Sequence, residues 1–203
     1  MTPGDHGRLL LLSGGVDSTA LAAICRPDHA LFIDYGQRPA AAEQRAATQV
    51  AHLFGLPLTT LQLDLRPLGG GLLLNEATQP GAPSPEWWPY RNQFLVTAGA
   101  AIAFQRGLSQ VLIGTVLGDG DRHADGTVRF YAALDELLRL QEGNLSVAAP
   151  GIDRTSEELV AASGLGADVL GWTVSCHRSN LPCGDCPGCW KRARVLRAAG
   201  MQP

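Results

Sequence analysis

The sequence lacks a hydrophobic run long enough to cross a membrane. Its longest central stretch without charged or strongly polar side chains, residues 94–104, has 11 residues, whereas a helix needs about 20 to span a bilayer. The N-terminal segment MTPGDHGRLLLLSGG has only four consecutive leucines and no small-residue cleavage site, so it makes a poor signal peptide. We therefore expect a cytoplasmic protein with no membrane partner.

The chain also lacks an excess of charge of either sign. It carries 16 basic and 19 acidic residues, a net charge of −3, which excludes a generally basic surface of the kind that binds nucleic acid. We therefore expect no nucleic-acid partner, and any such contact would be local. Lysine is almost absent: because Lys191 is the only one, any chemistry that needs a lysine must use it.

The composition is that of a compact, loop-rich globular protein. The 203 residues are 45% hydrophobic and include 24 glycines and 13 prolines, enough for one core of ordinary size. Short apolar runs alternate with segments of helical spacing. The pattern predicts strands at residues 8–12, 30–33, 58–63, 110–114 and 146–148, and helices at 17–25, 40–54, 92–106, 128–140 and 156–163. This alternation is typical of an α/β fold whose parallel sheet is covered on both faces.

One long segment, residues 67–89, has no periodicity and is rich in glycine and proline. A loop of this length in a compact domain is usually functional or mobile. It contains Trp87 and Trp88, for which two interpretations stay equally open. The indole rings either stack on a purine or anchor the loop to the core.

The segment SGGVDST, residues 13–19, follows the first predicted strand and begins the first predicted helix, where parallel sheets bind ligands. Gly14 and Gly15 let backbone N–H groups approach a phosphate, and the helix N-terminus favours an anion. Asp17 is suited to hold Mg²⁺ beside the phosphates. The available hydroxyl groups are those of Ser13, Ser18 and Thr19. We call this segment the phosphate loop; the alternative is a tight turn in which an aspartate caps the helix. No lysine follows the glycines, so it is not a Walker A loop.

Four cysteines lie close together near the C-terminus, with two C-x2-C spacings: Cys176, Cys183, Cys186 and Cys189. This pattern predicts a tetrahedral zinc site. Four protein ligands fill the coordination shell, so the zinc would be structural; the alternative is a pair of disulfides, which a reducing cytosol opposes. Cys25 stands alone, and we expect it to be a buried small hydrophobic residue.

We expect two parts, a nucleotide-binding domain at residues 1–172 and a zinc-binding tail at 173–203 that packs on it. The tail ends in a predicted helix at residues 191–199 that carries four basic residues, Lys191, Arg192, Arg194 and Arg197. Such a cluster usually forms a solvated helix face. Contact with a phosphate or with RNA is the alternative.

The motif SGGxDS resembles the PP-loop of the N-type ATP pyrophosphatases, which cleave ATP between the α and β phosphates. Together with the cysteine-rich tail, it makes the chain resemble the QueC family of 7-cyano-7-deazaguanine synthases. Four further segments are similar to that family, in the same order: DYGQR at residues 34–38 with Glu43 downstream, PYRNQFL at 89–95, IGTVLGD at 113–119 and SCHRSNLPCGDCPGC at 175–189. The resemblance extends over about residues 8–199. It implies a Rossmann-like fold, similar to the adenine nucleotide alpha hydrolases, with a zinc-bearing tail and a homodimeric assembly.

The resemblance implies an ATP-dependent carbon–nitrogen ligase of queuosine biosynthesis. Such an enzyme uses ATP and Mg²⁺ to activate the carboxylate of 7-carboxy-7-deazaguanine, takes ammonia to form the amide, and uses ATP again to reach the nitrile. The catalytic residues that it implies are Asp17, Arg91 and Asn92. Beyond the phosphate loop, Asp34 and Tyr35 would lie near the nucleotide. The implied substrate-binding residues are Arg38, Asp119, His123, Asp125 and Phe130.

The chain departs from the family at the substrate end. Where the family typically reads DYSGYPDCRPEF, residues 119–130 read DGDRHADGTVRF, and Ser156 stands in place of a usual lysine. These departures favour two alternatives: an enzyme that stops at the amide, or a QueC-like enzyme of bacterial antiviral defence that conjugates a deazaguanine to a protein amine. A tRNA-thiolating PP-loop enzyme, with Cys25 as its reactive thiol, is a further alternative. So is a nucleotide-binding module without catalysis.

Overall fold

The computed structural model describes residues 7–202, so the N-terminal residues 1–6, part of the segment in which we expect no signal peptide, lie outside the described part. Five parallel strands form one sheet in the order β3-β2-β1-β4-β5. The strands are β1 (Arg8–Leu11), β2 (His29–Asp34), β3 (Leu58–Gln62), β4 (Gln110–Leu112) and β5 (Ser146–Ala148). All five lie where the sequence predicts strands. The α/β architecture is therefore confirmed.

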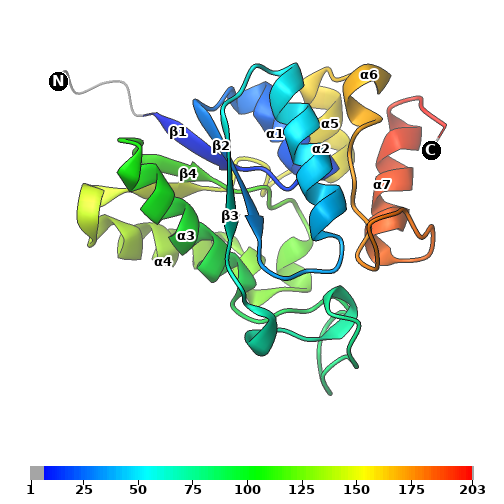
Figure 1. Cartoon of the computed structure of the whole chain (residues 1–203), viewed down its shortest axis with the longest axis horizontal. Helices are drawn as coiled ribbons and strands as arrows, with labels where there is room; N and C mark the ends of the chain where they lie inside the picture. The colour runs from blue at the N-terminus through cyan, green and yellow to red at the C-terminus, as the bar shows by residue number, and fades with distance from the viewer. Residues whose placement is uncertain (1–6, 203) are drawn as a thin grey trace.

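Helices cover both faces of the sheet (Figure 1). They are α1 (Val16–Cys25), α2 (Ala40–Leu53), α3 (Arg91–Gln105), α4 (Val128–Arg139), α5 (Ser156–Ser163), α6 (Ala167–Leu170) and α7 (Pro187–Ala198). One apolar core joins α1, α2, α5 and α7 to the sheet, and a second joins α3 and α4 to its other face. Because side chains of a strand point alternately to the two faces, neighbouring residues belong to different cores. In β1, Leu10 lies in the first core and Leu9 in the second. No helix in residues 7–202 is long and apolar enough to span a membrane.

The last helix begins earlier than the sequence predicts. The prediction places its start at residue 191, but α7 begins at Pro187, directly after Cys186. Proline is favoured in the first turn because its missing N–H would have no helical partner there. The sulfur of Cys186 accepts the N–H of Cys189 and so caps the helix. The short helix α6 was not predicted, because four residues show no periodicity.

The segment between β3 and α3, residues 63–90, contains two single-turn helices, η1 (Arg66–Leu68) and η2 (Gly71–Leu73). Trp88 anchors it: the side chain is 1% exposed and packs with Leu65 and Leu73 in a small separate core. Its ring meets that of Tyr35 edge to face, with centroids 5.1 Å apart. Anchoring is therefore the interpretation that holds for Trp88. Its neighbour Trp87 is only half-buried.

Within residues 173–202, the described part of the expected tail, several residues contact the sheet and the helices that cover it. The backbone N–H of Val174 donates to the carbonyl oxygen of Gly14 at 2.9 Å. The side-chain oxygen of Asn180 accepts the N–H of Ala42 at 2.9 Å. Further along, Val195 and Leu196 of α7 are buried in the same core as α1. The tail therefore contacts both the phosphate loop and the helix that follows it.

Candidate active site at the switch point of the sheet

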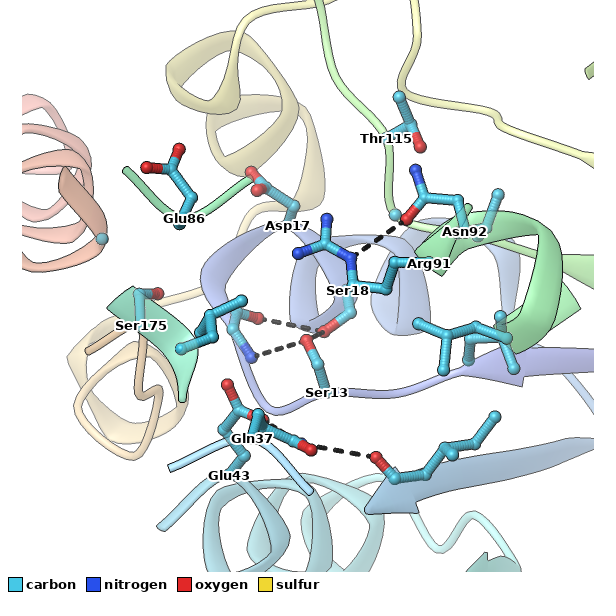
Figure 2. Close-up of a pocket in the computed structure, with 18 of the residues that line it drawn as sticks. Ser13, Asp17, Ser18, Gln37, Glu43, Glu86, Arg91, Asn92, Thr115 and Ser175 are labelled. Carbon is cyan, nitrogen blue, oxygen red and sulfur yellow. Dashed lines mark hydrogen bonds between the residues drawn. The ribbon is translucent and has the colours of Figure 1, made fainter. Parts of the chain in front are cut away.

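A cavity of about 280 Å³ opens at the carboxyl ends of β1, β2 and β4. In this strand order β1 is central: β2 and β3 lie on one side of it, and β4 and β5 lie on the other. The strand order therefore reverses direction at β1. Open α/β sheets bind ligands at such a switch point. The phosphate loop forms one wall, the start of α3 and residues 113–123 form another, and residues 174–191 of the tail complete it (Figure 2).

The backbone of the phosphate loop requires a glycine at position 14. Gly14 has a φ of +76°, and a Cβ atom there would lie 2.6 Å from the Cβ of Ala46, so only glycine fits. Gly15 precedes α1 without a side-chain cap, which leaves the helix N-terminus open toward the cavity. The hydroxyl groups of Ser13 and Ser18 lie 3.1 Å apart at the cavity wall. The loop therefore presents backbone N–H and hydroxyl donors together.

Of the two carboxylate oxygens of Asp17, one accepts a hydrogen bond and the other accepts none from residues 7–202. Its Oδ2 accepts the ammonium of Lys191 at 2.7 Å, while its Oδ1 is buried without a hydrogen-bond partner. A buried carboxylate oxygen without a donor is costly unless a ligand completes it. Hard cations such as Mg²⁺ prefer oxygen ligands, so this oxygen fits a magnesium ion held beside phosphates.

Arg91 and Asn92 begin α3 and face the loop across the cavity. Asp125 fixes Asn92, because its carboxylate accepts the backbone N–H at 2.8 Å and its carbonyl accepts the side-chain amide at 2.9 Å. The same amide lies 3.4 Å from the hydroxyl of Tyr131, which is 2.6 Å from that of Thr115. In residues 7–202, no carboxylate lies within ion-pair distance of the Arg91 guanidinium. Its Nε donates to the side-chain oxygen of Asn92 at 3.4 Å, so Arg91 is a hydrogen-bonded cation without an ion pair in the described residues (Figure 2).

A second polar group lies below the phosphate loop, where Gln37 and Glu43 line the cavity (Figure 2). The side chain of Gln37 donates to the Glu43 carboxylate at 2.8 Å and accepts the N–H of Tyr35 at 2.9 Å. Burial raises the pKa of Glu43 to about 7, although the bond from Gln37 opposes the shift. Burial also raises the pKa of Tyr35 to about 12. Glu43 can therefore change its charge near neutral pH.

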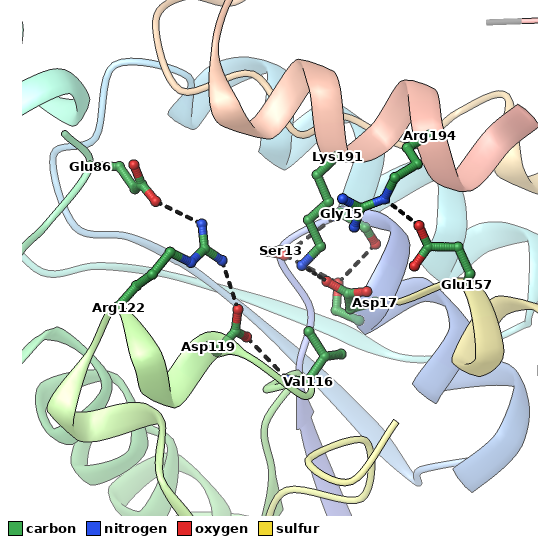
Figure 3. Close-up of polar contacts among 11 residues, drawn as sticks. Ser13, Gly15, Asp17, Glu86, Val116, Asp119, Arg122, Glu157, Lys191 and Arg194 are labelled. Atoms are coloured by element: carbon green, nitrogen blue, oxygen red, sulfur yellow. Dashed lines mark hydrogen bonds and ion pairs between the residues drawn. The ribbon is translucent and has the colours of Figure 1, made fainter. Parts of the chain in front are cut away.

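The wall formed by residues 113–123 carries two ion pairs, both made by Arg122 (Figure 3). Arg122 donates to Glu86 and to Asp119, both at 3.0 Å, and Asp119 also accepts the N–H of Val116 at 3.1 Å. Glu86 is 3% exposed, and its second oxygen is buried without a partner. Burial lowers the pKa of the neighbouring His123. This wall offers both acidic and basic groups to a polar ligand.

The four cysteines of the tail form a centre that fits one metal ion. Their Sγ atoms all lie within 4.8 Å of one another, and those of Cys183 and Cys189 are 3.9 Å apart. A tetrahedral zinc with Zn–S bonds of about 2.3 Å requires sulfur separations of roughly 3.8 Å. Backbone N–H groups donate to the sulfurs of Cys176, Cys183 and Cys186, as is usual for bound thiolates. A disulfide needs an S–S distance of about 2.05 Å, which is far shorter than the 3.9 Å between Cys183 and Cys189.

The structure brings together most, but not all, of the residues predicted for the site. Those that line the cavity are Ser13, Gly15, Asp17, Ser18, Tyr35, Arg91, Asn92, Asp119 and His123. Those that do not line it are Gly14, Thr19, Asp34, Arg38, Asp125 and Phe130. Arg38 donates to Asn75 at 2.9 Å, and Phe130 packs in the second core. Asp125 lies behind Asn92, as described above.

Several lining residues received no role from the sequence. They are Gln37, Glu43, Glu86, Thr115, Arg122, Ser175, His177 and Lys191. The motifs quoted above include or shortly precede five of them, Gln37, Glu43, Thr115, Ser175 and His177, and could have pointed to these residues. Arg122 lies in segment 119–130, which departs from the family, and Glu86 had no sequence signal. For Lys191 the sequence left two interpretations open, a solvated helix face and contact with a phosphate or RNA; the first does not hold, because the side chain is 24% exposed and pairs with Asp17 of the phosphate loop.

Cys25 and Ser156 also lie outside the cavity. Cys25 ends α1, at the opposite end of that helix from the phosphate loop, and is only partly buried against the core. Burial raises the pKa of its thiol, which makes it a poor nucleophile. Ser156, at the position of the family's usual lysine, is buried at the start of α5.

Comparison with known proteins agrees with this architecture. A sequence model described as queuosine biosynthesis protein QueC matches residues 8–200. A 7-cyano-7-deazaguanine synthase of Acidobacterium capsulatum is 33% identical over 98% of this chain and 95% of its own length. Synthases of the same name from Koribacter versatilis and Methanocaldococcus jannaschii are 32% and 27% identical, covering 97% and 96% of this chain and 92% and 96% of their own. The match extends over both the phosphate loop and the cysteine tail, and the chain therefore belongs to the QueC family.

Proposed function

We propose that the protein uses ATP to activate the carboxylate of 7-carboxy-7-deazaguanine and then joins the activated acyl group to ammonia. A carboxylate oxygen attacks the α phosphorus of ATP, and pyrophosphate leaves. Ammonia then attacks the acyl carbon, AMP leaves with the former carboxylate oxygen, and a proton is released. The step is needed because a carboxylate oxygen is a poor leaving group, whereas AMP leaves readily.

The observation that carries the proposal is the shared cavity, in which the phosphate loop faces Arg91 and Asn92. We assign the phosphates of ATP to the loop, with Mg²⁺ at Asp17. The magnesium ion would neutralise charge on the phosphates. Arg91, which has no carboxylate partner, would stabilise negative charge that develops on the transferring group. Asn92, whose amide is held by Asp125 and Tyr131, would position the Arg91 guanidinium, because its Oδ1 accepts the Arg91 Nε–H at 3.4 Å.

The polar wall of Glu86, Asp119, Arg122 and His123 supports binding of the deazaguanine base. A purine-like base has hydrogen-bond donors and acceptors along its edges, and these side chains offer both kinds of partner. The buried, unpartnered oxygen of Glu86 would accept an N–H of the base. Further turnover of the amide to the nitrile, with a second ATP, would use the same groups.

The proposal includes a structural zinc ion and a homodimer in the cytoplasm. The sulfur separations in the cysteine centre support zinc, which has no open coordination position when four thiolates bind it. Metal analysis should find about one zinc per chain. Sedimentation velocity of the purified protein tests the dimer.

One alternative product follows from the altered segment 119–130. A protein amine can attack the activated acyl group as ammonia does, and Thr127 of this chain stands where the family has an arginine. The thiolation alternative has less support, because Cys25 does not line the cavity. Product mass separates these outcomes.

The test is release of pyrophosphate and AMP by the protein with ATP, Mg²⁺, ammonium and 7-carboxy-7-deazaguanine. Release should require the carboxylate, so 7-deazaguanine without that group should give none. Carboxylate-independent release, or none with the carboxylated base, contradicts the proposal. A binding module would show no turnover in either case.

A further inference from the structure

The only lysine of the chain reaches into the cavity from the tail. Lys191 lies in α7, and its Nζ donates to Oδ2 of Asp17 at 2.7 Å (Figure 3). The two side chains are only 24% and 14% exposed, whereas lysines mostly lie in solvent. Most of the Lys191 side chain is therefore buried, and its ammonium group lies beside the phosphate loop.

The phosphate loop has no cation of its own. Residues 13–19 include one charged side chain, the anionic Asp17. ATP is multiply anionic, so backbone N–H groups alone would leave part of its charge without a positive partner. Three arginine or lysine residues line the cavity: Arg91, Arg122 and Lys191. Of these, Arg122 is paired with Glu86 and Asp119, and Arg91 starts α3 on the facing wall. Lys191 is therefore the cation that lies against the loop.

The helix that carries Lys191 is fixed along its length. At Gly188, an added Cβ would lie 1.7 Å from the carbonyl oxygen of Ser175, so α7 contacts this segment directly. One turn after Lys191, Arg194 pairs with Glu157 at the start of α5 (Figure 3). Val195 is fully buried in the core. The position of the ammonium is thus set by the fold.

We propose that Lys191 binds the phosphate chain of ATP and supplies the positive charge that the phosphate loop lacks. An ammonium has three N–H donors, so it can keep its bond to Asp17 and still donate to phosphate oxygens. Because α7 follows the cysteine centre directly, this role gives the metal-binding tail a part in nucleotide binding. The inference rests on the proposed use of ATP.

The test is equilibrium binding of an ATP analogue with a methylene group between the α and β phosphates, in the presence of Mg²⁺. Lys191→Met should weaken binding about tenfold to a hundredfold, as expected for loss of a charge-assisted hydrogen bond. Lys191→Arg should stay within about fivefold of wild type, because the charge is kept. Arg197→Met is the matched control: it removes one positive charge from an exposed position of the same helix, outside the cavity, and should bind like wild type. Equal losses in the Lys191→Met and Arg197→Met variants would overturn the inference.

A second comparison separates direct contact from an effect through Asp17. In an Asp17→Asn background, Lys191→Met should still weaken binding at least about fivefold; if the effect disappears, Lys191 acts only on Asp17 and the inference fails. Circular dichroism spectra and zinc content should match between variants, whereas Lys191→Met should lower the melting temperature because it leaves the Asp17 carboxylate without its donor. Absence of binding by the wild-type chain contradicts the proposed function and with it this inference, whereas wild-type binding that Lys191→Met leaves unchanged contradicts the inference alone.

Discussion

The backbone N–H of Val174 donates to the carbonyl oxygen of Gly14 at 2.9 Å, which joins the cysteine tail to the phosphate loop. The contact involves only backbone atoms, so it depends on where the tail is held and not on which side chain residue 174 carries. Gly14 lies three positions before Asp17, and Val174 lies two positions before Cys176. This hydrogen bond therefore connects the segment that leads into the cysteine centre directly to the phosphate loop.

Loss of the metal should weaken nucleotide binding. Cys186→Ser, which removes a buried sulfur of the centre, should lose zinc, lower the melting temperature and weaken ATP binding at least about fivefold. Cys25→Ser is the control, because that thiol lies outside the centre. Metal content, calorimetry and nucleotide titration check this. A zinc-free protein with undiminished ATP affinity would show that the tail and the loop are independent.

Asp17→Asn should reduce pyrophosphate release by at least about a hundredfold while the fold persists, because the variant loses the charge that would hold Mg²⁺. Asp168→Asn, which changes an exposed carboxylate in α6, should behave like wild type. Initial rates of pyrophosphate release and circular dichroism spectra measure both effects. Full turnover by Asp17→Asn would mean that the phosphates bind elsewhere.

The stability of the protein should depend on pH through Glu43. Burial raises the pKa of this carboxyl from 4.5 to about 7, so the folded state favours its neutral form. The stabilisation is complete below about pH 4.5 and is lost as the pH rises through about 7. Relative to wild type, Glu43→Gln should therefore gain at most about 3 kcal/mol in unfolding free energy between pH 5 and pH 8. Urea denaturation at both values tests this, and a difference that does not change with pH would contradict it.

Trp88→Ala should destabilise the protein by about 3–5 kcal/mol, because it removes a fully buried aromatic side chain. Trp88→Phe should cost less, since the indole N–H that it deletes has no hydrogen-bond partner. Trp87→Ala should have a smaller effect, as Trp87 is half-buried. Chemical denaturation followed by circular dichroism gives the unfolding free energies of the three variants. If Trp88→Ala kept wild-type stability and lost only base binding, the ring would be a binding platform and not an anchor.

The sequence was most informative where the relevant residues are contiguous. The phosphate loop and the cysteine centre each lie within a short segment, so their spacing alone indicates their geometry. The sheet was predictable for a similar reason, since each strand is a short apolar run whose burial requires helices on both faces.

Contacts between distant segments could not be predicted. Lys191 and Asp17 are 174 positions apart, and no local pattern reports how α7 packs against α1. Glu86 gave no signal either, because its burial follows from Trp88 anchoring the loop. Asp125 was predicted to bind substrate, but it lies behind Asn92, where the packing of α3 places it. These residues are defined by tertiary packing, which propensity and spacing do not encode.

The most direct test of the account uses 7-carboxy-7-deazaguanine whose carboxylate carries a heavy oxygen isotope. The labelled base is incubated with ATP, Mg²⁺, ammonium and the protein, and the base, AMP and pyrophosphate are analysed by mass spectrometry. Activation through an acyl adenylate predicts heavy oxygen in AMP, none in pyrophosphate, and a base that has become the amide or the nitrile. AMP that carries no label, or ADP and phosphate in its place, would contradict adenylation of the carboxylate.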